Sequence, residues 1–65
     1  MEEVKKPKAK LVGANGNIFN LMGIASRSLK AAGQSDKATE MSKRVMSSGS
    51  YDKALSIIME YVEVE

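Results

Sequence analysis

Apolar residues recur along most of the chain with the period of an α-helix. From residue 18 they are spaced three or four apart up to Gly33, the spacing of a helix with one buried face. Asn17 stands just before this pattern, where a short polar side chain caps the first turn, and Gly33 offers the left-handed conformation that ends a helix. The pattern therefore predicts a helix over residues 18–32.

Two further helices follow after very short turns. The second has a narrower apolar stripe, with Ser35 or Asp36 as its expected N-cap, and it should end before Gly49. Ser50 is expected to cap the third helix, whose apolar face starts at Tyr51. The spacing therefore predicts three short helices that reverse direction at each turn.

Both ends of this helical region alternate instead, as half-buried strands do. Residues 8–12 are Lys-Ala-Lys-Leu-Val, and residues 61–65 are Tyr-Val-Glu-Val-Glu. Either strand alone would leave backbone groups unpaired, so we expect the two to pair, and to be antiparallel because the last strand continues from the third helix without a reversal. The predicted fold is α+β: three short helices packed on a two-stranded antiparallel sheet, in one domain over residues 8–65 after a disordered basic lead of residues 1–7.

Composition restricts the chemistry. With 65 residues and neither cysteine nor histidine, the chain has no thiolate zinc ligand and no imidazole base for a nucleophilic triad. Three short helices scarcely enclose a pocket that would shift the pKa of a carboxylate or a lysine for catalysis. We therefore expect no catalytic residue, no cofactor and no metal. The absence of a long apolar run or an apolar leader predicts a cytoplasmic protein without a membrane segment.

The segment Gly-Ala-Asn-Gly-Asn, residues 13–17, has two interpretations. Glycines before a helix N-terminus form anion-binding loops in some proteins, which would make this chain an anion- or nucleotide-binding module. The segment lacks the lysine of a P-loop and the third glycine of the dinucleotide fingerprint. We favour a tight strand-to-helix turn, which needs the same residues.

Basic residues gather in the N-terminal half of the chain. Such a cluster binds nucleic acid in some proteins, but more often it keeps one end of a chain soluble. Weak nucleic-acid binding is therefore an alternative function. Its candidate contacts are Lys5, Lys6, Lys8, Lys10, Arg27 and Lys30.

Several apolar residues lie away from the centres of the predicted stripes. A small core does not readily cover them all, so they are candidates for a surface that contacts a partner. They are Phe19, Ile24, Met46 and Met59. The main hypothesis is accordingly a non-enzymatic accessory or protein-interaction domain with an unidentified protein partner. We expect a monomer rather than a homodimer.

Three stretches of the chain carry a resemblance to a known group of proteins. They are LVGANGNIFNLMGIASRSLKAAG from residue 11, SGSYDKAL from residue 48 and the final YVEVE. With this Val-Gly-x-x-Gly-Asn corner, Ser-Gly-x-Tyr-Asp junction and terminal strand, residues 8–65 resemble small uncharacterised proteins of bacteria, their prophages and conjugative elements. The resemblance implies a compact α+β domain and a mobile-element context, and it assigns no activity to any residue.

Overall fold

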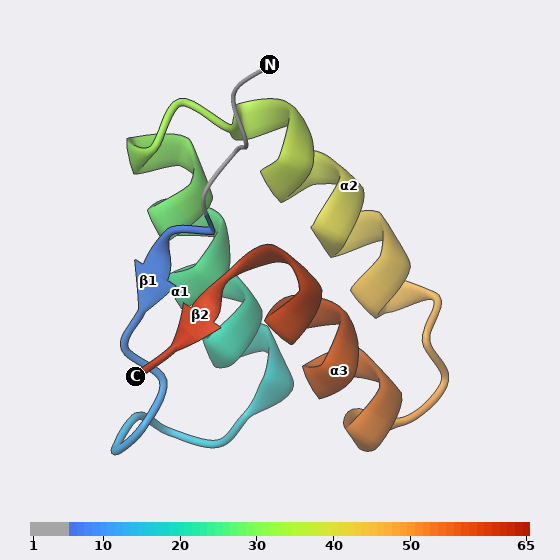
Figure 1. The fold of residues 1–65 in the computed structure, drawn as a ribbon. Coiled ribbons are helices and arrows are strands. Elements are labelled where there is room, and N and C mark those ends of the chain that lie inside the picture. The colour runs from blue at the N-terminus through green and yellow to red at the C-terminus, as the bar shows by residue number, and fades with distance from the viewer. Residues whose placement is uncertain (1–5) are drawn as a thin grey trace.

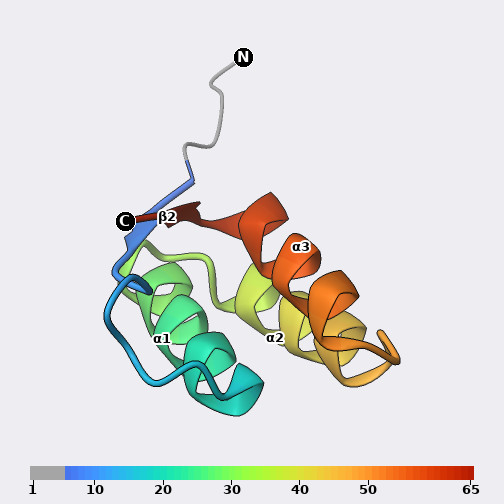
Figure 2. The same ribbon diagram turned by 90° about the horizontal axis from the view of Figure 1, so that it is seen from below.

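The computed structural model describes residues 6–65, which form three helices and two very short strands (Figure 1). In chain order the elements are β1 (Lys8–Ala9), α1 (Ile18–Ala31), α2 (Ser35–Met46), α3 (Tyr51–Tyr61) and β2 (Glu63–Val64). The strands lie against α1 and α3, whereas α2 packs on the other two helices alone (Figure 2). The broad α+β prediction with three helices is therefore confirmed.

Helix α1 begins where the sequence predicts and ends one residue earlier than predicted, at Ala31. The side chain of Asn17 accepts a hydrogen bond from the backbone N–H of Phe19 at 2.9 Å, which caps the first turn. At the other end Gly33, with φ at +77°, donates to the carbonyl of Lys30. Gln34 donates to the carbonyl of Leu29, five residues before it. These two bonds form a Schellman motif, which closes the helix and needs a residue in the left-handed region.

The start of α2 differs from the prediction. The N-cap residue is Gln34 rather than Ser35 or Asp36, and Ser35 is already the first residue of the helix. Gln34 closes the Schellman motif at the end of α1, and the chain enters α2 immediately afterwards. Gln34 therefore takes the N-cap position. Helix α3 begins as predicted, with the hydroxyl of Ser50 accepting from the backbone N–H of Lys53 at 3.2 Å.

The apolar faces of the helices and the inner side of the strands share one core. Its buried residues are Ala9, Leu11, Leu21, Ala25, Leu29, Ala38, Met41, Val45, Ala54, Ile58, Tyr61 and Val62. Every buried side-chain nitrogen or oxygen within residues 6–65 has a hydrogen-bond partner. Apolar packing with satisfied polar groups is what a stable small domain needs.

The two strands are parallel, so the predicted antiparallel sheet was wrong. Lys8 lies opposite Glu63, and Ala9 lies opposite Val64. The prediction assumed that the chain leaves α3 without turning, but it bends at Val62 and then runs in the direction of β1 (Figure 1). Val62 is extended, with φ −135° and ψ 155°, and its side chain is buried. Burying this apolar side chain stabilises the reversal.

Both strands are shorter than predicted, but their backbone pairing extends beyond them. The N–H groups of Leu11 and Val12 both donate to the carbonyl of Glu65, at 2.9 and 3.0 Å. At the opposite end, the N–H of Glu63 donates to the carbonyl of Pro7 at 2.9 Å. The first and last described segments therefore hold each other in place.

Candidate functional site

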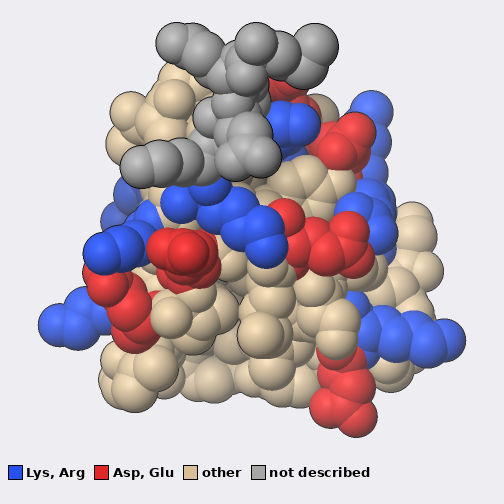
Figure 3. Space-filling view, viewed as in Figure 1, with Lys and Arg blue, Asp and Glu red and all other residues tan. Residues whose placement is uncertain are grey.

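An apolar groove lies between the corner that follows β1, one side of α3, and β2. Its volume is 260 Å³. Its lining residues are Leu11, Val12, Ala14, Gly16, Leu21, Tyr51, Leu55, Met59 and Val64, and this hollow is called the groove below. None of these residues is charged, and the lower middle of the face in Figure 3 is correspondingly free of acidic and basic side chains.

Four large apolar side chains in the groove are exposed to solvent. Their exposed fractions are 70% for Val12, 48% for Tyr51, 51% for Met59 and 39% for Val64. They come from the corner, from both ends of α3 and from β2, so the fold brings them together from separate parts of the sequence. Exposed apolar side chains that gather in a concave surface are typical of a binding site.

Hydrogen bonds fix the corner that forms one wall of the groove. The hydroxyl of Tyr51 donates to the carbonyl of Gly16 at 2.7 Å, which ties the corner to the first turn of α3. Within the corner, Asn15 Oδ1 accepts from the N–H of Asn17 at 2.9 Å. The side-chain amide of Asn20 donates to the carbonyl of Asn15 at 3.1 Å. The wall is therefore held by the chain itself, without a ligand.

The size of the groove indicates what it accommodates. Pockets that enclose small-molecule ligands are usually about 300–1,000 Å³, and an apolar cavity of about 150 Å³ takes up one benzene. At 260 Å³ the groove suits one or two apolar side chains from another chain. Its floor includes Leu11 and Leu21, both buried, so an inserted side chain would continue the core.

The fold divides the four residues predicted to form a partner surface. Met59 lines the groove. Ile24 is partly buried and packs against the core. Phe19 and Met46 are exposed by 60% and 65%, but neither lines the groove. Of the four residues, Met59 alone lines the groove, and a partner surface made of all four stays a prediction.

Three exposed residues of the groove are not predicted by the sequence, namely Val12, Tyr51 and Val64. Its patterns place Val12 and Val64 in strands and Tyr51 on the buried face of α3. The structure leaves Tyr51 about half exposed because its hydroxyl reaches out to the corner. Only the tertiary arrangement joins these three positions, so no local periodicity in the sequence marks them.

The glycine corner is built as a turn. Gly13 has φ +86°, a conformation that a glycine adopts without steric cost. Three N–H groups at the start of α1 are already bonded: that of Phe19 to the Asn17 side chain, and those of Asn20 and Leu21 to the Asn17 carbonyl. These contacts favour the turn interpretation over an anion- or nucleotide-binding loop.

Basic candidates on the strand side have acidic or carbonyl neighbours. Lys8 lies opposite Glu63 in the sheet, and Lys6 Nζ donates to the carbonyl of Met59 at 3.1 Å. Figure 3 shows acidic and basic side chains mixed on this face of the molecule. Acidic side chains close to lysines weaken the attraction for phosphate.

The remaining basic candidates within the described residues are on the same strand side or on α1. Lys10 is exposed just after β1, and Arg27 and Lys30 are exposed on α1. Lys5 belongs to residues 1–5 of the predicted basic lead, which are outside the described part of the chain. Nucleic-acid binding stays a prediction, and no contact in residues 6–65 favours it.

A polar network joins α2 to α3 on the far side of α3 from the groove. The guanidinium of Arg44 donates to both carboxylate oxygens of Glu60, at 2.9 and 3.1 Å, and to the hydroxyl of Tyr61 at 3.0 Å. It also lies 5.6 Å from the centre of the Tyr61 ring, within range of a cation–π contact. The Tyr61 hydroxyl in turn donates to Glu40. We call this network the Arg44 clamp.

The clamp shifts the acid–base equilibria of its members. Hydrogen bonds to Glu60 and then to Tyr61 raise the pKa of Arg44, and the hydrogen bond from Arg44 lowers the pKa of Glu60. Burial, followed by the hydrogen bond to Glu40, raises the pKa of Tyr61. Each shift favours the form that holds α2 against α3, so these groups have a structural role.

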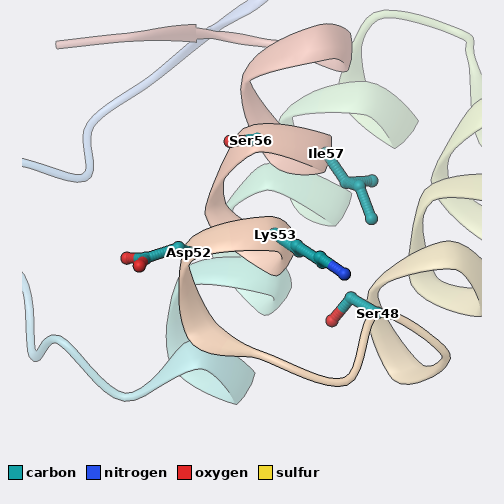
Figure 4. A pocket seen from close by; sticks show the side chains of 5 residues that line it. All are labelled: Ser48, Asp52, Lys53, Ser56 and Ile57. Carbon is teal, nitrogen blue, oxygen red and sulfur yellow. The ribbon is translucent and has the colours of Figure 1, made fainter.

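A second hollow of 370 Å³ lies at the turn between α2 and α3. Its lining residues are Ser48, Asp52, Lys53, Ser56 and Ile57. Figure 4 shows Asp52 and Ser56 directed away from Lys53 and Ser48. The hydroxyl of Ser48 donates to the carbonyl of Val45 at 2.8 Å, within the turn. The Ser48 hydroxyl is therefore used by the turn, and within residues 6–65 no hydrogen bond joins it to Lys53.

Residues 6–65 contain neither a metal-binding cluster nor a membrane-spanning helix. No cluster of three or more acidic side chains there has the arrangement of a metal site. No helix in the same range has both the length and the apolar character to cross a membrane. In comparisons with known proteins, no family model, curated protein or solved structure matches the chain. The resemblance to prophage and conjugative-element proteins stays a prediction.

Proposed function

We propose that the protein is a non-enzymatic interaction domain that binds an apolar segment of another protein in the groove. One observation carries this proposal: Val12, Tyr51, Met59 and Val64, all exposed, converge on a single preformed hollow. The catalytic alternatives lack a comparable arrangement of reactive groups. An accessory role in a mobile element is compatible with such a domain and rests on the resemblance alone.

The energetics support a protein partner. Removing apolar surface from water is worth about 25 cal/mol per Å², and a domain of this size buries a smaller share of its surface than a large one. A partner that covers the groove would add apolar burial that the chain alone does not achieve. Binding would therefore also stabilise the folded state.

A matched pair of methionine variants tests the proposed function. Met59 and Met46 are both exposed and both near the C-terminal end of a helix, but Met59 alone lines the groove. We expect an immobilised Met59→Asp chain to lose a protein that the wild-type chain retains from an extract of its source, while Met46→Asp keeps it. The retained protein is then purified and its binding to all three chains is measured. Equal binding to the two variants would contradict the proposed function.

A further inference from the structure

We propose that the occupant of the groove is an extended segment that pairs with the free edge of β2 as a third strand and alternates apolar with basic residues. This inference rests on the proposed function and specifies the kind of partner. Three features carry it: the direction of the backbone groups in β2, the alternation of its side chains and the charge on its outer face.

The first feature is an edge of β2 that β1 does not use. The N–H groups of Glu63 and Glu65 donate to the carbonyls of Pro7 and Ala9, so these residues direct their backbone groups toward β1. Backbone groups of successive residues in a strand point to opposite edges, so those of Val64 point to the other edge. An exposed strand edge of this kind is a template for another strand.

The second feature is that the same residue reaches the groove. The side chain of Val64 lines it, together with Met59 and Leu55 of α3. A strand added beside β2 would place alternate side chains on the face that Val64 occupies, because side chains alternate with a period of two. Those alternate positions must be apolar to enter the groove.

The third feature is the charge on the opposite face. Glu63 and Glu65 are exposed and share a hollow with Lys6 and Lys8, but among the described residues neither carboxylate forms an ion pair, so both can still pair with a ligand. The intervening side chains of an added strand would lie beside these two carboxylates, since they occupy that same outer face. Lysine or arginine is favoured there, and the predicted ligand therefore alternates apolar and basic residues.

The same features disfavour other occupants. A second copy of β2 would place its own Glu63 and Glu65 beside the first pair, and like charges at neighbouring strand positions repel. An amphipathic helix docks through a row of apolar anchors along several turns, whereas a hollow of 260 Å³ suits one or two side chains. An extended basic and apolar segment meets neither difficulty.

Two synthetic peptides test the sequence requirement. One alternates lysine and valine over about seven residues, a typical strand length, and the other carries glutamate in place of lysine. We expect the lysine peptide to bind the wild-type chain about tenfold more tightly, from favourable and unfavourable pairings with Glu63 and Glu65. Replacing both by lysine (Glu63→Lys with Glu65→Lys) should reverse the order of the two peptides. Equal affinities for both peptides would overturn the charge requirement.

A proline variant tests strand pairing itself. Val64→Pro removes the outward N–H and leaves the N–H groups of Glu63 and Glu65, which pair with β1. Val64→Ala trims the side chain but keeps that N–H, so it is the matched control. We expect Val64→Pro to abolish binding of the lysine peptide and Val64→Ala to weaken it slightly, with urea unfolding confirming that both variants fold.

The outcomes separate the two proposals. If Val64→Pro binds the lysine peptide as Val64→Ala does, strand addition is overturned, while groove binding still stands if Met59→Asp loses the captured protein. If Met59→Asp and Met46→Asp retain that protein equally, the proposed function fails. Should Val64→Pro not fold, the reversal of peptide preference by the double lysine variant decides the inference.

Discussion

Helix α3 has two sides with contrasting surroundings. Toward α2, Ile58 is fully buried, and in the Arg44 clamp the guanidinium of Arg44 donates hydrogen bonds to Glu60 and Tyr61. Toward the groove, Tyr51 and Met59 remain about half exposed. The apolar residues of one helix thus serve two purposes: those facing α2 stabilise the fold, and those facing the groove are available to a partner. Apolar character alone does not separate these roles, but the presence of a covering element does.

Two adjacent residues of α3 separate these roles most strongly. Ile58→Ala should lower the free energy of unfolding by about 2–5 kcal/mol, because it leaves a cavity in the core. That loss is a large part of the stability of a small domain. Met59→Ala should change it by less than about 1 kcal/mol, because this side chain is half exposed. Urea unfolding followed by circular dichroism measures both, and similar losses would show that Met59 belongs to the core.

Two glycines of the corner, which forms one wall of the groove, should differ in how much their substitution lowers stability. Gly13→Ala should cost about 1–2 kcal/mol, because φ is +86° at this position. Gly16→Ala should change stability by less than about 0.5 kcal/mol, because its new Cβ would lie 3.8 Å from the Tyr51 hydroxyl, an ordinary contact. The same unfolding measurement compares them. A larger loss for Gly16→Ala would mean that the wall is not built as described.

The clamp side of α3 predicts a small loss of folding stability at alkaline pH. Because burial and Glu40 raise the pKa of Tyr61, the folded chain keeps this proton where the unfolded chain loses it. The contribution of the Tyr61 proton to folding stability is complete below the usual tyrosine pKa of about 10. It is lost as the pH rises from there through the raised pKa of Tyr61. Tyr61→Phe should remove this loss.

Ultraviolet absorbance of tyrosinate follows the same residue directly. The wild-type chain contains two tyrosines, and the titration should show a late step from Tyr61, above the usual tyrosine pKa of about 10. Tyr61→Phe should remove this late step, whereas Tyr51→Phe should keep it. A later step that survives in Tyr61→Phe would contradict the assignment to the clamp.

The three helices could be predicted from the sequence, because helices and their ends depend on local features. The apolar spacing, the Asn17 and Ser50 caps and the left-handed Gly33 act within a few residues, and the structure has each of them. The direction of β2 depends instead on where Val62 is buried, and that involves residues far away in the chain.

The groove was harder to predict for the same reason. Met59 was identified as an apolar residue without a place in the core, and it does line the groove. Val12 and Val64 have ordinary strand character, and only the parallel sheet brings them together beside α3. A site made from three elements has no single motif, whereas the groups of the glycine corner that suggested a ligand loop bond to one another.

The most direct test of the account uses the methionine methyl groups as reporters in nuclear magnetic resonance spectra. With these methyls labelled by carbon-13, the lysine–valine peptide is added to saturation. We expect the Met59 signal in the groove to shift, while exposed Met46 and buried Met41 keep theirs. An unchanged Met59 signal, or an equal shift at Met46, would contradict the claim that the groove is the binding surface.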